Sequence, residues 1–333
     1  MKKTIIIITT LIVAIASITG YILYKRNSAE EPVNIIAADQ KVKIKDAKMF
    51  LKGFPAQSAN EDPREYFSDE IVNVYTVRFF KFIQTEIDYT TREDHLKAVK
   101  AYLLSVLDPH KALEMFALYE KFLDYEIGLS EKMKSWSYPS TNDEFLRYLQ
   151  TVQNYRREIF GTSVADAMWG AEVKAREYSI RKNVILFDQN LYGEEKERKI
   201  RDLNEEMWGE EAGSLEEPPQ TDPEKFTSYQ EKQALYQRDI QELPPEQRRE
   251  KINEFRKEYF SAEQIARLEK VDAELEAEKQ KEAQYQLREK AIQNNPSLDP
   301  NQKAQAIREL QDNLFGEDAD ALRRRLNIQR GLK

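Results

Sequence analysis

The sequence has no cysteine and only two histidines, so several kinds of site are excluded from the start. Without a thiol the chain forms no disulfide, has no thiolate nucleophile and offers no cysteine ligand to zinc. His95 stands near the start of a predicted helix, and His110 follows Asp108-Pro109 in a turn. We expect surface or capping roles for both imidazoles.

Motifs that hold phosphate, nucleotide or metal are missing as well. The sequence contains no phosphate-binding loop, no dinucleotide fingerprint, no G-x-S-x-G elbow and no H-E-x-x-H pair. Acidic clusters such as GEEKER are far more common on solvated helix faces than around a cation. The sequence therefore predicts a protein that is not an enzyme and that uses no cofactor, no metal and no small-molecule substrate.

Glycine is scarce, with 10 residues in 333, where roughly 7% is usual. The second half is dominated by Glu, Gln, Lys, Arg, Leu and Ala, which lose little side-chain freedom in a helix. Alternating runs of Val, Ile, Thr and Tyr are nearly absent after residue 90. These features predict an all-α fold.

The net charge of −8 and the sequence pI of about 5.3 argue against a nucleic-acid partner. Binding to phosphates requires a basic face that displaces counterions, and no segment supplies one. The acidic excess is better suited to keeping an elongated molecule soluble.

One long apolar run stands at the N-terminus. An uncharged stretch over residues 4–24 follows Lys2 and Lys3 and is followed by Lys25 and Arg26. About 20 apolar residues suffice to cross a bilayer, so residues 1–26 predict a transmembrane anchor. The competing interpretation is a signal peptide cleaved after Ala14-Ile15-Ala16. The apolar run continues beyond that site, which favours an anchor whose apolar side chains include Ile5, Leu11, Ile18 and Leu23.

Composition divides the rest of the chain. We expect a tether over residues 27–44, a first helical mini-domain over 45–128, an extended helical domain over 129–252 and a second helical mini-domain over 253–333. Two predicted helices of the first mini-domain meet at Asp108-Pro109. Their apolar side chains are expected to pack, and they are Leu96, Val99, Leu103, Leu107, Leu113, Phe116, Leu118, Phe122, Leu123 and Ile127.

An internal repeat occupies the second half. RREIFGTS at 156–163 resembles RKEYFSAE at 256–263, and NLYGEEKERKIRDLNEEMWGEEA at 190–212 resembles SLDPNQKAQAIRELQDNLFGEDA at 297–319. The offset grows from 100 to 107 residues between the two pairs. Seven residues are close to two helical turns, so a longer second helix would keep its apolar face in phase. Each copy predicts a helix, a turn, a long helix, a turn and a third helix.

The long helix of the second copy is thinly apolar. Residues 261–294 carry only a sparse stripe, formed by Ile265, Leu268, Leu275, Leu287 and Ile292. Such a helix is either exposed between domains or awaits a partner. Proline-rich breaks at 213–227 and 243–245 flank it on the N-terminal side, so the sequence predicts an extended arrangement of helices.

The stretch VRFFKFIQTEIDY at 77–89 concentrates aromatic residues in a charged chain. On a helical wheel Phe79, Ile83 and Ile87 form a core stripe with Phe80 at its edge. Phe82 lies off that stripe, on the side of Arg78 four residues earlier. The pair is either an internal cation–π contact or a landing site for a partner.

In these motifs the chain resembles the lipase chaperones, also called lipase-specific foldases. The likeness rests on the anchor, the 77–89 segment, the AYL and LDYE helices at 101–103 and 123–126, the RREIFG segment and the C-terminal half, and it covers roughly 45–325. Spacing places Phe80 on the phenylalanine of the family's RxxFDY motif. Lys81 then stands at the aspartate position, Phe82 at the tyrosine position and Val77 at the arginine position, with Arg78 one place late.

The resemblance implies two small helical headpieces joined by a long helical arm that wraps a secreted lipase. It implies a steric chaperone in the inner membrane, single-pass, with the bulk of the chain in the periplasm. Arg78, Phe80 and Phe82 would then lie near the lipase contact. The alternative is a non-catalytic helical scaffold or spacer of the cell envelope, without folding activity.

Overall fold

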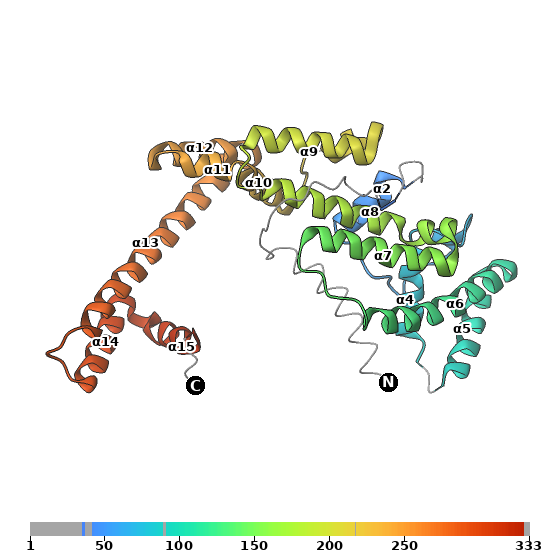
Figure 1. Cartoon of the computed structure of the whole chain (residues 1–333), viewed down its shortest axis with the longest axis horizontal. Coiled ribbons are helices and arrows are strands. Elements are labelled where there is room, and N and C mark those ends of the chain that lie inside the picture. Colours follow the sequence, from blue (N-terminus) through green and yellow to red (C-terminus); the bar gives the residue numbers. More distant parts are fainter. Residues whose placement is uncertain (1–34, 37–41, 89–90, 217, 330–333) are drawn as a thin grey trace. The chain divides into compact units, whose positions relative to one another are not determined.

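A computed structural model of the chain describes residues 35–36, 42–88, 91–216 and 218–329, and all regular secondary structure in them is helical (Figure 1). The predicted all-α class is confirmed. The chain divides into two compact units, the first ending at Gln220 but including Glu231–Glu242, the second formed by Thr221–Gln230 and the chain from Leu243 onward. The division at residues 44, 128 and 252 and the extended arrangement stay predictions.

The predicted location in the inner membrane is overturned. Within the residues that the structure describes, no helix is both long enough and apolar enough to cross a bilayer. The physical reason is charge: the longest helices carry Lys, Arg, Asp or Glu at nearly every turn. The predicted anchor over residues 1–26, with Ile5, Leu11, Ile18 and Leu23, lies outside the described residues.

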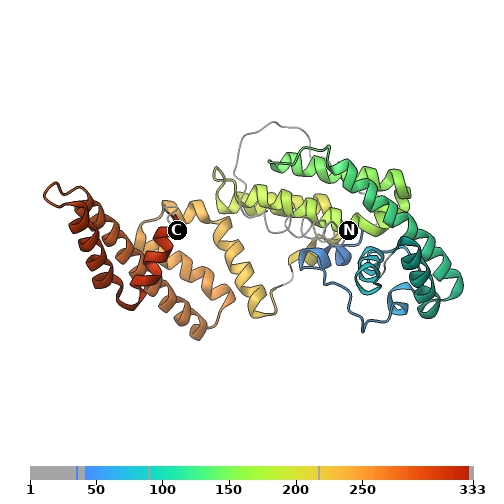
Figure 2. The same ribbon diagram turned by 90° about the horizontal axis from the view of Figure 1, so that it is seen from below.

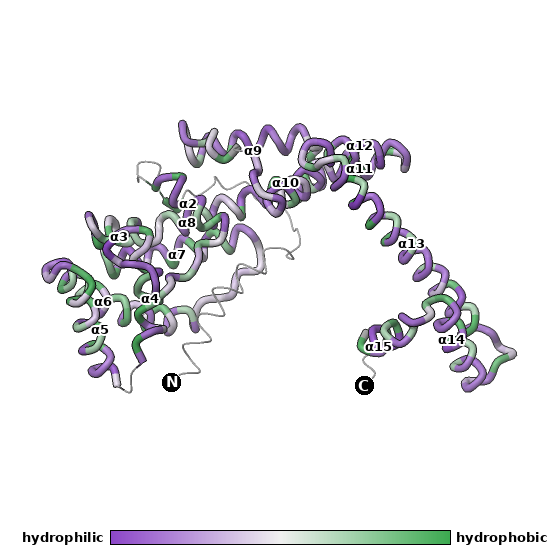
Figure 3. The backbone as a smooth tube through the Cα atoms, turned by 180° about the vertical axis from the view of Figure 1, so that it is seen from behind, coloured by the Kyte–Doolittle hydropathy of each residue, from purple (hydrophilic) through white to green (hydrophobic). Residues whose placement is uncertain are grey.

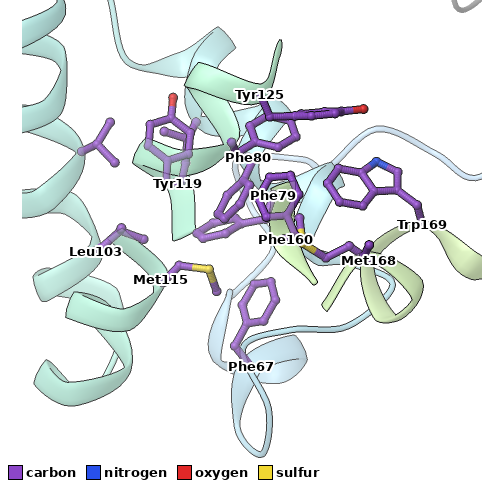
Figure 4. Close-up of a cluster of buried hydrophobic side chains, with 14 of the residues drawn as sticks. Phe67, Phe79, Phe80, Leu103, Met115, Tyr119, Tyr125, Phe160, Met168 and Trp169 are labelled. Carbon is purple, nitrogen blue, oxygen red and sulfur yellow. The ribbon is translucent and has the colours of Figure 1, made fainter. Parts of the chain in front are cut away.

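The first unit contains most of the helices and the largest core. Its helices are α2 (Ile44–Leu51), α3 (Arg64–Phe67), α4 (Thr76–Glu86), α5 (Arg92–Val106), α6 (Pro109–Met133), α7 (Asn142–Phe160), α8 (Thr162–Leu186), α9 (Gly193–Trp208), η1 (Gly209–Glu216) and α11 (Gln237–Glu242). Buried aromatic and sulfur-containing side chains of α3, α4, α6, α7 and α8 meet in one cluster (Figure 4). The mini-domain of 45–128 thus shares its core with α7 and α8.

The second unit is built around one long helix. It contains α12 (Pro245–Tyr259), α13 (Ala262–Gln293), α14 (Pro300–Phe315), η2 (Gly316–Asp318) and α15 (Ala319–Gln329), together with the first residues of α10 (Asp222–Leu235). Helix α14 folds back along the C-terminal part of α13 (Figures 1 and 2).

Helix boundaries follow local chemistry. The Thr91 hydroxyl accepts a hydrogen bond from the Asp94 amide at 3.1 Å and begins α5, while Asp108 caps α6 with Pro109 at its first position. His110, in that first turn, is exposed as expected. His95 differs: it is buried, with Nε2 2.7 Å from the Tyr119 hydroxyl. The expected surface role is wrong for His95, because α6 covers the face of α5 that carries it.

The sequence repeat is also a structural repeat. In both copies an arginine near the end of a helix donates from Nε to a buried tyrosine hydroxyl, Arg156 to Tyr125 at 3.0 Å and Arg256 to Tyr229 at 3.1 Å. The same tyrosines pack edge-on against matching rings, Phe160 in the first copy and Phe260 in the second. The tyrosines stand on α6 and α10, so the repeat extends one helix further toward the N-terminus than the sequence indicated.

The last helix of each copy is fastened in the same way. Lys196 Nζ donates to the carbonyl of Leu186 at the end of α8, and Lys303 Nζ donates to that of Gln293 at the end of α13. These ammonium groups satisfy carbonyls that a helix end leaves unpaired. Tyr178–Trp208 and Tyr285–Phe315 form matching edge-on ring pairs, and each final helix ends at a glycine with positive φ, Gly209 and Gly316.

The two long helices differ in their surroundings. In α8 most residues are buried, because α2, α7, α9 and the residues Ile35 and Ile36 cover it. In α13 every residue from 271 to 281 is exposed, and Figure 3 shows the helix as mostly hydrophilic. The exposed state predicted for this thinly apolar helix is therefore observed within its own unit.

A buried carboxylate attaches the N-terminal segment to α8. Glu177 is 1% exposed; its Oε2 accepts the Ile35 amide at 3.2 Å and its Oε1 lies 3.5 Å from Arg181. Desolvation raises the pKa of Glu177 from 4.5 to about 6, against the opposing effects of the Ile35 amide, Arg181 and Lys174. The folded state therefore holds this proton more tightly than the unfolded chain.

Replacing Glu177 by glutamine should stabilise the first unit at neutral pH. One pKa unit corresponds to about 1.4 kcal/mol, so keeping this carboxylate ionised in the fold costs about 2 kcal/mol. The increase in the free energy of unfolding caused by Glu177→Gln should be complete above pH 6. It should vanish below pH 4.5, where Glu177 is protonated in both the folded and the unfolded state. Urea unfolding followed by tryptophan fluorescence across this range tests it. Glu205→Gln, at an exposed position on α9, is the matched control, and equal effects of the two changes would contradict the prediction.

Candidate partner-binding surface

Arg78, on α4, lies inside a cage of aromatic rings. Its guanidinium carbon is 5.1 Å from the ring centroid of Phe54, 5.0 Å from that of Tyr66 and 5.4 Å from that of Tyr75. The side chain is 9% exposed and forms an ion pair with Glu61. Three rings and a carboxylate account for most of its surface, so its cation–π contacts are internal, but they are made with Phe54, Tyr66 and Tyr75 and not with Phe82 as the sequence suggested.

The ion pair belongs to a small network in the irregular segment before α4. The Ser58 amide donates to Glu61 Oε1 at 3.0 Å, and the Tyr66 hydroxyl donates to Oε2 at 2.9 Å. These two hydrogen bonds, followed by the charge of Arg78, hold the pKa of the Glu61 carboxyl below its ordinary value. Arg78 thereby fastens residues 54–66 to α4.

The two phenylalanines differ in accessibility. Phe80 is fully buried, with ring centroids 5.2 Å from Tyr119 and 5.1 Å from Phe122 on α6 (Figure 4). Phe82 is half-buried and stacks on Phe79 at 6.4 Å with an interplanar angle of 13°. Of the three residues proposed to contact a partner, Phe80 is buried, while Arg78 and Phe82 are half-buried. Their partner-binding role stays a prediction.

Lys81 stands at the position of the motif aspartate and turns toward α6. It forms an ion pair with Glu126, which also accepts a hydrogen bond from Gln84, and its Nζ lies 5.6 Å from the Phe122 ring centroid. The reversed charge at this position is therefore matched by a glutamate within the chain. Lys81 links α4 to α6 and is not left as an isolated cation.

An exposed apolar patch lies on the α5–α6 hairpin. Leu104 is 44% exposed and Leu113 47% exposed, although the sequence indicated packing for Leu113. Lys100 Nζ lies 5.5 Å from the ring centroid of the half-buried Phe116. Helices α5 and α6 pack against each other as an antiparallel hairpin. From the Lys100–Phe116 contact we infer that Leu104, one turn closer to the connection between the helices, lies near Leu113. We call Leu104, Leu113 and Phe116 the hairpin patch. Its only signal in the sequence is that Leu104 stands beside, and not within, the apolar stripe of α5.

Acidic clustering does not supply a metal site here. No group of three or more histidine, aspartate or glutamate side chains in the described part of the chain is arranged to hold a metal ion. What this unit presents is a rigid aromatic core, a cage that fixes the segment before α4, and an apolar patch on its hairpin.

Loss of the caged cation should destabilise the first unit. Arg78→Met keeps the bulk of the side chain but removes the cation that contacts three rings and Glu61. We expect the free energy of unfolding to fall by about 2 kcal/mol. Arg92→Met is the control, since its ion pair with Asp124 is exposed and should be worth under about 0.5 kcal/mol. Urea midpoints of the two variants measure the difference, and similar midpoints would show that the cage contributes little.

Comparison with known proteins gives one family. A family model described as the proteobacterial lipase chaperone protein matches residues 118–319. No curated protein and no solved structure matches the chain. The matched region begins within α6 and includes both copies of the structural repeat, while α2 to α5, with Arg78, Phe80 and Phe82, precede it. Because the match spans more than half of the chain, this protein belongs to the lipase chaperone family.

Proposed function

We propose that the chain is a steric chaperone that binds a near-native lipase and lowers a barrier to its folding. The observation that carries the proposal is the lipase chaperone match over 118–319. It is supported by the absence of recognisable nucleotide and metal motifs from the sequence, because such a chaperone has only its binding energy to use. A folding step that a lipase cannot complete alone is a kinetic problem, and stabilising its transition state solves it.

Rigidity is the physical property that this mechanism needs. A surface that is already ordered loses little conformational entropy on binding, so more of the contact energy remains to stabilise the bound lipase. The interlocked rings around Phe80 and the caged Arg78 supply such order to α4, α5 and α6. A lipase held against this unit would meet fixed side chains.

Within the first unit, the hairpin patch is the surface that we propose contacts the lipase, together with the half-buried Phe82. Leu104 and Leu113 expose apolar area beside charged neighbours, which is the composition of an interface centre with a polar rim. Arg78 and Phe80 would act through the fold, by fixing the position of α4, and not by direct contact.

A second function, a helical scaffold without folding activity, is favoured by one observation. Residues 271–281 of α13 are exposed on all sides, as a spacer would be. The scaffold predicts that changes to Phe82 and the hairpin patch leave function intact, whereas helix-breaking changes abolish it.

A refolding experiment tests the chaperone. The lipase of the same organism is denatured and diluted with and without an equimolar amount of the chain, and recovered esterase activity is measured. We expect recovery to rise at least tenfold with the chain. Recovery equal to that of the chaperone-free sample would rule the proposed function out.

Variants test the proposed surface. Leu104→Ser with Leu113→Ser should lower the recovered activity at least fivefold, while circular dichroism shows an unchanged helix content, because both side chains are exposed. Val184→Ser, at an equally exposed position near the end of α8, is the matched control. An unchanged yield with the double variant would remove the hairpin patch from the interface.

A further inference from the structure

A cavity in the first unit lies where α8, α9 and the chain before α2 meet. It has a volume of about 510 Å³, within the range of small-molecule sites. Its apolar wall includes Val42, Met207 and Trp208, and its charged lining includes Lys174 and Lys43. Neither the hairpin patch nor the cage of Arg78 contributes to it.

Lys174 is the unusual member of this lining. The residue is 8% exposed, so most of its aliphatic stem is removed from water, while its Nζ keeps some contact with solvent. The Nζ lies 4.6 Å from the ring centroid of Trp208, which lines the same cavity. Among the described residues the ammonium has neither a hydrogen-bond acceptor nor a carboxylate within ion-pair distance.

The nearest carboxylates are engaged elsewhere. Glu177 accepts the Ile35 amide and pairs with Arg181, and Glu211 accepts the Ile44 amide at 2.8 Å. Both glutamates act on Lys174 only by longer-range electrostatic attraction, which raises the pKa of the ammonium. Desolvation is the larger effect, so the pKa is lowered. A partly desolvated ammonium that no carboxylate of the described chain pairs with can donate to an acceptor brought by a ligand, which would offset part of its desolvation.

Charge at the cavity limits the kind of acceptor. Four glutamates line it, Glu205, Glu206, Glu210 and Glu211, against two lysines. This excess repels anions in proportion to their charge, so it acts most strongly on phosphates and other polyanions and least on a monocarboxylate, for which direct contact with Lys174 can offset it. The face of Trp208 and the side chains of Met207 and Val42 offer contact to an apolar body.

We propose that Lys174 and this cavity bind a small monocarboxylate with an apolar body, the carboxylate accepting from Nζ and the body lying against Trp208. Such ligands include short free fatty acids and the carboxyl end of a peptide. The site is separate from the proposed lipase contact and goes beyond the chaperone function, so its failure leaves that function untouched.

Calorimetric titration of the full chain at pH 7.5 tests the site, with hexanoate as the probe. Hexanol and hexylamine, which have the same chain length and a neutral or cationic head group, are the control ligands, and each is called a match below. Hexanoate should bind at least tenfold more tightly than either match. Lys174→Met keeps the length of the side chain and removes the ammonium, so it should weaken hexanoate at least tenfold. Lys45→Met, on α2 outside the cavity lining, should leave the affinity unchanged.

The fold of the variant is checked separately. Removing an unpaired buried charge should leave thermal unfolding of Lys174→Met unchanged or shifted upward, so lost binding cannot be ascribed to unfolding. N-acetyl-Leu-Leu with a free carboxyl end assigns the source: binding tighter than that of hexanoate supports a peptide end, and weaker binding supports a free acid. The proposal is overturned if no heat is detected up to 20 mM hexanoate, if hexanol binds as well, or if Lys174→Met binds hexanoate like the parent chain.

Discussion

A guanidinium that donates to a buried tyrosine hydroxyl is the interaction on which both compact units depend. Arg156 and Arg256 each stand just before the short break between two helices, and each reaches a tyrosine on a preceding helix, Tyr125 or Tyr229. Arg256 is buried and Arg156 half-buried, and a guanidinium removed from water is tolerated only when its donors are used and its faces are covered. The hydrogen bond joins two helices, and a second contact of the same guanidinium, with Trp169 on α8 or with Asp272 on α13, brings in a third.

The two copies complete this arrangement differently. In the first, Trp169 covers the Arg156 guanidinium, with its ring centroid 4.8 Å from the central carbon. In the second, the corresponding position is Glu269, and the carboxylate of Asp272 pairs with Arg256 instead. Trp169 is buried with α8 in the first core, whereas Asp272 attaches α13 to Arg256 at a partly exposed position. The first copy became the centre of a large unit, whereas the second kept a minimal core and a bare helix.

Much of this could be predicted from the sequence because helix formation and repetition leave local traces. Low glycine, strong helix formers and the 100- and 107-residue offsets indicated the all-α class and the duplicated helices. The core positions of Phe79 and Ile83 followed from a helical wheel, which gives the direction of a side chain relative to its own helix. What covers that side chain depends on other helices, so the complete burial of Phe80 and His95 could not be derived. The ion pair between Arg78 and Glu61 could not be predicted either, because the irregular segment before α4 has no periodicity from which its contacts could be inferred.

The seven residues that separate the two offsets have a geometric consequence. The Arg256–Asn253 hydrogen bond matches Arg156–Gln153 at the earlier offset, and the Tyr285–Phe315 pair matches Tyr178–Trp208 at the later one. The extra residues therefore lie between Arg256 and Tyr285, a stretch that includes the exposed part of α13. Seven residues lengthen a helix by about 10 Å yet rotate its end by only about 20°. The insertion thus lengthens α13 while the contacts at its two ends keep nearly the same orientation. Further insertions of seven residues would lengthen the helix again by the same amount.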